Sequence, residues 1–388
     1  MKKVLVKIIC LVAFQSVFSQ DLKISKYARV PVDSTEFEFL KNDLSTFLKS
    51  CLTKNIDTSY IKESYRKLSV SSFKKFSDYI VDENGELKPD RSWSVLNIIP
   101  KSKSKIEITT AIVMHQEDEA ADLLCLFHFF TTKINGKYMF YIPLEEQIKD
   151  WDTQIVGNIT YYYKKCIDTE NAKLFDSKNS EIAKKLNVKP EQFQFFICED
   201  YQAILNMRGF DYSISDNGLY RDGYGLVGNR AIFSVMGNED FSHDIFHYYS
   251  GKINNHINRN WIAEKALAYL WGNAYYTDQN GNMILFDTLI NHLKQLVEHQ
   301  PELNLLEVFK NNTSLFDKYA PEVASQSAIA AVLAKEVEKI YGTVGVLKLI
   351  NSGRDNRLEN FLKTVDTLLG INEVNFNSKL TDLILQED

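Results

Sequence analysis

Residues 242–272 read SHDIFHYYSGKINNHINRNWIAEKALAYLWG, and this stretch holds the strongest functional pattern in the chain. Two histidines in it, His243 and His247, are four residues apart. On a helix, that spacing places both imidazoles on one face, a single turn apart. A carboxylate, Asp244, directly follows the first histidine. The pattern therefore predicts a helix that presents a pair of candidate metal ligands.

A second carboxylate, Glu264, lies downstream in the segment WIAEKALAYL, whose apolar residues have helical spacing and whose preceding residue, Asn260, is a favourable N-cap. Two imidazoles and a carboxylate form a ligand set that Zn²⁺ accepts while a fourth position stays open for water. The alternative is a helix whose two histidines are satisfied by ordinary core or surface contacts. Because the chain has only 7 histidines in 388 residues, the spacing favours a zinc site with His243, His247 and Glu264 as ligands.

The combined pattern resembles the gluzincin metallopeptidases, in particular the peptidase MA-like domains of bacterial extracytoplasmic proteins. These domains have a strand, an H-E-x-x-H helix and a downstream segment like W-[LIF]-x-E-G-[LF]-A-x-Y-[LF]. The matching segments here are RAIFSV (residues 230–235), HDIFH (residues 243–247) and WIAEKALAYL (residues 261–270). The resemblance implies an exported zinc-dependent peptidase that acts on a peptide or protein substrate. It also implies that residues 230–235 form the edge strand that binds an extended peptide.

Two positions depart from the pattern of that family. Asp244 occupies the position of the general-base glutamate, and Lys265 replaces the glycine that usually follows the ligand glutamate. Aspartate has a pKa similar to that of glutamate, but it is one CH₂ shorter, and a misplacement of about 1 Å can cost on the order of 10²-fold in rate. The resemblance further implies a tyrosine that stabilises the oxyanion, and Tyr319 is our candidate. Two functions remain open: a peptidase with Asp244 as the base, and an inactive zincin-fold protein that acts as a binding or interaction module.

The first 19 residues have the pattern of a secretory signal peptide. A basic start, MKKVLVK, precedes the apolar residues 8–14, and VFS offers small residues before a cleavage site. Because this apolar run is too short for a membrane span, we expect an extracytoplasmic protein, periplasmic or secreted, without a membrane span. The net charge of −6 and the lack of a basic run argue against a nucleic-acid partner. One of the five cysteines, Cys10, lies within the signal-peptide pattern. Of the other four, Cys166 and Cys198 could form a disulfide, or all four could remain buried free thiols.

The remaining chain is long enough for two domains, and the polar residues 144–150 form a plausible boundary. Residues 151–388 alternate strand and helix patterns before the histidine motif and are helical after it. We expect a zincin-like domain here, with a small mixed sheet and a helical lower subdomain. Within this domain, YRDGYG (residues 220–225) is interpreted as a glycine-rich turn.

Residues 20–150 have a different pattern. Two helical periodicities come first, at residues 37–51 and 71–81, and four strand patterns follow. The last two strands flank Asn135-Gly136, the strongest short hairpin signal. Helices followed by an antiparallel meander indicate an α+β domain, and its late hairpin resembles that of the nuclear-transport-factor-two-like domains. The predicted fold class of the whole chain is therefore α+β.

Overall fold

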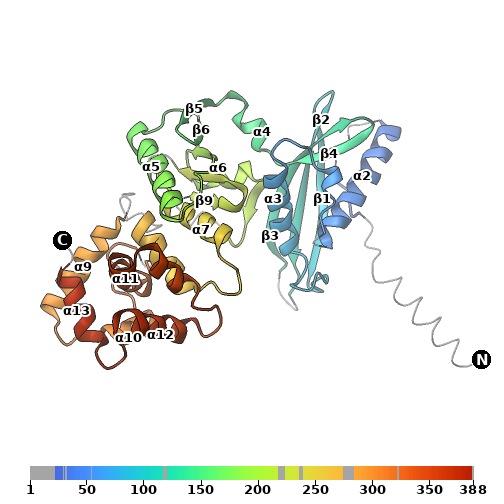
Figure 1. The fold of residues 1–388 in the computed structure, drawn as a ribbon. Helices are drawn as coiled ribbons and strands as arrows, with labels where there is room; N and C mark the ends of the chain where they lie inside the picture. Colours follow the sequence, from blue (N-terminus) through green and yellow to red (C-terminus); the bar gives the residue numbers. More distant parts are fainter. Residues whose placement is uncertain are drawn as a thin grey trace, which may run out of the picture. The chain divides into compact units, whose positions relative to one another are not determined.

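The computed structural model describes residues 22–28, 30, 33–53, 55–116, 120–216, 223–235, 239–273, 284–320 and 323–386 (Figure 1). The predicted signal peptide, residues 1–19, lies outside them. The chain divides into two compact units, Met1–Asp150 with Gln202–Tyr220, and Trp151–Tyr201 with Arg221–Asp388. Helices and sheets occur in both, and the predicted α+β class is confirmed. The return of Gln202–Tyr220 to the first unit differs from the expectation that residues 151–388 form one domain.

The first unit has helices packed on an antiparallel sheet (Figure 1). Its sheet has the order β1-β2-β3-β4, and β8 pairs with β3. Asn135 and Gly136 have φ of 52° and 83°, which are the values that a two-residue hairpin turn between β3 and β4 requires. The elements are α2 (Ser34–Leu52), η1 (Thr58–Tyr60), α3 (Arg66–Asp78), β1 (Arg91–Ser102), β2 (Lys105–Met114), β3 (Asp122–Ile134), β4 (Lys137–Tyr141), α4 (Leu144–Gln147), η2 (Ile148–Asp150) and β8 (Phe210–Ser213), and α6 (Tyr201–Met207) leads into β8.

Aromatic side chains hold the helices of the first unit on its sheet. Phe47 of α2 is stacked on Phe140 of β4, with ring centroids 4.6 Å apart. Phe73 of α3 contacts Phe127 and Phe129 of β3 edge-on, each at 5.4 Å. All five rings are fully buried, so the helical and strand periodicities of the sequence meet in one core.

The second unit has a mixed sheet of order β5-β6-β7-β10-β9. The pairs β6·β7 and β7·β10 are parallel, whereas β5·β6 and β10·β9 are antiparallel. The strands are β5 (Asp152–Val156), β6 (Ile159–Tyr163), β7 (Phe193–Cys198), β9 (Gly223–Leu226) and β10 (Ala231–Val235). Two expectations need correction. The strand before the histidine motif, β10, lies inside the sheet, and its neighbour β9 is at an edge. Residues 223–225, the described part of the glycine-rich segment that we interpreted as a turn, belong to β9.

The other described elements of the second unit are helical. They are α5 (Thr169–Lys185), the 3₁₀ turn η3 (Val227–Asn229), α7 (Ser242–Ile253), α8 (Trp261–Leu267), the π-helical segment η4 (Ala268–Gly272), α9 (Phe286–His299), α10 (Leu305–Asn311), α11 (Ser325–Ile350), α12 (Arg357–Leu369) and α13 (Phe376–Gln386). The long helix α11 packs against α8, and the other C-terminal helices are arranged around it (Figure 1). Its buried face, together with α7, α8 and the sheet, forms one continuous hydrophobic core. This core fixes α7 and α8, the two helices that carry the predicted site.

Two further properties concern membrane-spanning helices and the cysteines. In the part of the chain that the structure describes, no helix is both long enough and apolar enough to cross a bilayer. Cys51, Cys125, Cys166 and Cys198 are all free thiols, and Cys166 is exposed rather than buried.

Candidate functional site

The histidine pair lies at the start of α7. The Nε2 atoms of His243 and His247 approach to 3.2 Å, and their ring centroids are 4.9 Å apart. Trp261 is stacked almost parallel on His247 at 5.2 Å, and the ring of Tyr269 lies 5.6 Å from that of His243. The spacing of four residues thus brings both imidazoles to one face of the helix, among aromatic side chains.

The hydrogen bonds of the two rings define which nitrogen carries the proton. Nδ1 of His243 lies 2.9 Å from the carbonyl oxygen of Asn273, and Nδ1 of His247 lies 3.0 Å from Oε1 of Glu264. A carbonyl or a carboxylate only accepts, so each Nδ1 is the donor. Burial, together with the nearby His247, lowers the pKa of His243 to about 3, which keeps that ring neutral at pH 7. Nε2 of neutral His243 therefore presents a lone pair to Nε2 of its neighbour.

Glu264 is fully buried in the first turn of α8, and both its carboxylate oxygens accept hydrogen bonds from Arg259. Nε of Arg259 lies 2.7 Å from Oε2, and Nη2 lies 2.6 Å from Oε1. Burial by itself raises the pKa of Glu264, but the hydrogen bonds from His247 and Arg259 outweigh it and leave that pKa below its ordinary value. Glu264 is therefore a charged group that orients His247 through Nδ1.

This arrangement differs from the expected ligand set. The resemblance implies that Glu264 faces the same ion as both Nε2 atoms, whereas the structure puts its carboxylate on the opposite nitrogen of His247, where Arg259 binds it in a bidentate manner. Within the described residues, no group of three or more His, Cys, Asp or Glu side chains is arranged to hold a metal ion. The two histidines alone converge.

The carboxylate of Asp244 packs against the backbone of Gly225, which has no side chain. Its Oδ2 would be only 1.7 Å from a Cβ placed on Gly225 of β9, so the carboxylate occupies the space that a side chain there would fill. Burial raises the pKa of Asp244 to about 6, and the nearby His247 opposes that rise. The carboxylate is thus close to the edge strand and is mainly ionised at pH 7.

The structure locates the oxyanion candidate elsewhere. Tyr319 contacts His292 edge-on, with centroids 5.6 Å apart, and the described residues include no contact between Tyr319 and the histidine pair. The tyrosine beside the pair is Tyr269, which is almost fully buried in the π-helical segment η4. π-Helical turns are frequent at functional sites. The sequence signal for Tyr269 was its place in the WIAEKALAYL segment.

Three further residues support the site and were missed from the sequence. Arg259 fixes Glu264, and its signal was its position just before the N-cap of α8. Asn273 contacts His243 through its backbone carbonyl oxygen, which no side-chain pattern can reveal. Gly272 lets the end of η4 approach α7, because a Cβ there would lie 2.6 Å from the backbone nitrogen of His243.

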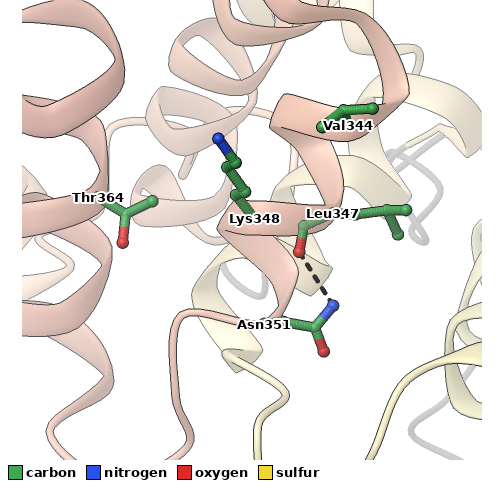
Figure 2. Close-up of a pocket in the computed structure, with 5 residues that line it drawn as sticks. All are labelled: Val344, Leu347, Lys348, Asn351 and Thr364. Atoms are coloured by element: carbon green, nitrogen blue, oxygen red, sulfur yellow. Dashed lines mark hydrogen bonds between the residues drawn. The ribbon is translucent and has the colours of Figure 1, made fainter.

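A hollow of about 530 Å³ lies away from the histidine pair, between the end of α11 and α12 (Figure 2). Figure 2 shows the hydrogen bond of 3.0 Å in which the side-chain amide of Asn351 donates to the carbonyl oxygen of Leu347. The lining residues are Val344, Leu347, Lys348, Asn351 and Thr364. This set holds a single charged side chain and no acid–base pair, so the hollow offers no catalytic arrangement.

No protein-family model and no curated protein matches this chain. The resemblance to the gluzincin metallopeptidases therefore depends on the quoted residues alone. What the site does has to be inferred from its geometry, in particular from the two converging Nε2 atoms.

Proposed function

We propose that this protein is an exported zincin-like hydrolase that binds one Zn²⁺ through His243 and His247 and cleaves peptide bonds with Asp244 as the base. One observation carries the proposal: two Nε2 atoms lie 3.2 Å apart, and both Nδ1 atoms are occupied by acceptors. Because both Nδ1 atoms donate, the two Nε2 atoms can approach this closely only with a proton or a metal cation between them, and two imidazoles on one helix face suit a metal. Zinc–nitrogen bonds of about 2.0–2.1 Å are compatible with that separation if the ion lies off the line between the two atoms.

The other residues have supporting roles in this proposal. Glu264 orients His247, and the carbonyl of Asn273 orients His243, as carboxylates and carbonyls commonly do for metal-binding histidines. When bound, a zinc ion supplies Lewis acidity at the scissile carbonyl. Asp244 accepts a proton from the attacking water, and the adjacent edge strand β9 provides the backbone along which an extended peptide can align.

A second function is favoured by a specific observation. Two histidines are one protein ligand fewer than catalytic zinc sites usually have, and Arg259 occupies both oxygens of Glu264, the residue that would complete the set. A zincin-fold protein that binds a partner without hydrolysis is therefore the alternative. The basic and apolar pattern of residues 1–19 supports an extracytoplasmic location for either function.

The first experiment measures zinc content and peptide hydrolysis together. We expect about one zinc per chain in the wild type, loss of zinc in His243→Ala and His247→Ala, and a 10–100-fold weaker affinity in Glu264→Gln. His299→Ala is the matched control, because His299 is exposed and its Nδ1 lies 2.7 Å from the carbonyl oxygen of Gln295 in its own helix, outside the candidate site. Unchanged zinc in His243→Ala would contradict the metal site.

Hydrolysis of a mixed peptide library by the zinc-loaded protein separates the two functions. As a peptidase, the wild type should exceed Asp244→Ala by about 10²-fold or more, the range of general-base contributions. Zinc binding without hydrolysis by the wild type, Asp244→Ala or Asp244→Glu would rule out the peptidase and support the binding module.

A further inference from the structure

A positively charged pocket of about 300 Å³ lies beside the proposed zinc site. This volume is at the lower end of the range for small-molecule sites. The lining residues are His256, Arg259, Trp261, Arg354 and Arg357. Three of them are arginines, although the chain as a whole has a formal net charge of −6. The pocket is therefore a local concentration of positive charge on a protein whose net charge is negative.

Among the described residues, most of this charge has no counter-ion, and of the three arginines Arg259 alone is paired with a carboxylate, that of Glu264. Nη1 of Arg354 lies 3.0 Å and 2.9 Å from the ring nitrogens of His256, which carry no negative charge. In the described part of the chain, the guanidinium of Arg357 has neither a carboxylate nor a hydrogen-bond partner. Two guanidinium groups thus face the pocket with their charge uncompensated.

The pocket is held in place by hydrogen bonds from Asn260 to two backbone carbonyls. The side-chain amide of Asn260 donates to the carbonyl oxygen of Arg357 at 2.7 Å, and the backbone nitrogen of Asn260 donates to that of Ile350 at 2.6 Å. These bonds fix the start of α12 beside the start of α8. The like charges are therefore brought together by the fold, and they are present before any ligand binds.

Lys265 adds a fourth cation nearby. Its Nζ lies 5.7 Å from the ring centroid of Trp261. Burial lowers the pKa of Lys265, and the charge of Arg357 lowers it further. This lysine is the second departure from the gluzincin pattern, and the proposed hydrolysis gives it no role. Several cations at close range repel one another, and a bound anion would offset that repulsion.

We infer that this pocket binds a phosphate monoester, with the phosphate on Arg354 and Arg357 and the organic group against Trp261. Guanidinium groups match the geometry of phosphate oxygens and bind them in a bidentate manner. Trp261 is 42% exposed and offers an aromatic surface at the same pocket. Binding of the ester at this pocket requires neither zinc nor peptide hydrolysis, although Trp261 also stacks on His247 and Arg259 also holds Glu264.

Isothermal titration of the purified protein at constant ionic strength tests this inference, with inorganic phosphate, phenyl phosphate and benzoate as the probes. We expect phenyl phosphate to bind more tightly than inorganic phosphate, and both to bind more tightly than benzoate. The double variant Arg354→Gln/Arg357→Gln should weaken both phosphate probes by at least about tenfold, because charge-assisted hydrogen bonds are lost. Trp261→Ala should abolish the advantage of phenyl phosphate.

Arg230→Gln is the matched control, since Arg230 is an exposed arginine of the same unit that pairs with Glu191 outside the pocket. It should bind all three probes like the wild type. Equal phosphate affinity in the wild type and the double variant would overturn the site. Benzoate that binds as tightly as phenyl phosphate would overturn its assignment to a phosphate. Because Arg354 and Arg357 are exposed, the double variant should keep the melting temperature of the wild type.

Discussion

Asp244 needs a neighbour without a side chain. A Cβ on Gly225 would lie 1.7 Å from Oδ2 and 2.7 Å from Cγ of Asp244, so the glycine provides the space for the carboxylate. Gly225 is not among the glycines with positive φ. Its role is therefore close approach, not a turn, and an analysis of local sequence could not distinguish the two because the neighbour comes from another element.

Gly225→Ala should displace the carboxylate of Asp244 toward solvent. Burial is the main cause that raises the pKa of Asp244 to about 6, so in this variant the pKa should fall toward the ordinary value of about 3.9. A ¹³C NMR titration of the aspartate carboxyl carbons in the metal-free protein measures this shift. Gly228→Ala is the control, because nothing lies within 4 Å of the added Cβ. A pKa that stays near 6 in Gly225→Ala would show that Asp244 does not depend on this space.

The candidate site was predictable from the sequence only in part. The spacing of His243 and His247 sufficed to bring them together, because helix geometry alone determines which residues share a face. The direction of Glu264 was not predictable. It depends on Arg259, a competing partner from the preceding loop, and on a side-chain conformation that no residue spacing encodes.

At the scale of the element, α8 is anchored by its N-cap residue. Asn260 accepts a hydrogen bond from the backbone nitrogen of Ile262 at 3.0 Å and is fully buried. The hydrogen bonds that it donates reach the carbonyls of Ile350 and Arg357. The sequence predicted a helix that begins after Asn260, and this prediction is confirmed. The links to α11 and α12 were not predictable, because they join residues about ninety positions apart.

Asn260→Ala should therefore lower the free energy of unfolding by more than the loss of an ordinary helix cap does. Removing a cap costs about 0.5–2 kcal/mol, and a buried carbonyl left without its donor adds about 1–3 kcal/mol. Chemical denaturation gives the free energy of unfolding. The control is Asp168→Ala, because Asp168 caps α5 through two exposed hydrogen bonds. This substitution should lower the free energy of unfolding by the cost of a cap alone, about 0.5–2 kcal/mol. If both variants lose the same stability, the bond from Asn260 to Arg357 contributes nothing.

Other elements show where local signals suffice. A glycine, Gly342, interrupts a long helical periodicity, and α11 changes direction there, with φ of 59° and ψ of −157°. The edge position of β9 had no such signal. Strand order in a sheet depends on which strands pair, and pairing partners are selected by the whole core.

At the scale of the molecule, the chain leaves the second unit and returns to the first for one short strand. Phe210 of β8 pairs with Phe127 of β3, and their ring centroids are 4.9 Å apart. His128 donates its backbone N–H to the carbonyl of Gly209 at 2.7 Å, which continues this pairing. A strand of four residues carries little periodicity, so the sequence could not show to which sheet it belongs. The α+β class followed from long periodic segments, and those were sufficient.

Phe210→Ala should destabilise the first unit and leave the second unchanged. Phe210 is 1% exposed, and the loss of a buried phenylalanine side chain costs about 3–5 kcal/mol. Hydrogen–deuterium exchange should therefore speed up in β1 to β4, where local opening becomes less costly, but not in α11.

Phe376→Ala is the matched variant, because Phe376 of α13 is fully buried in the core of the second unit. It should give the reverse pattern, with faster exchange in α11 and unchanged exchange in β1 to β4. A Phe210→Ala protein whose exchange changes in α11 alone would mean that β8 belongs energetically to the second unit. The contrast between the two variants measures which unit depends on β8, because each removes the same side chain from a different core.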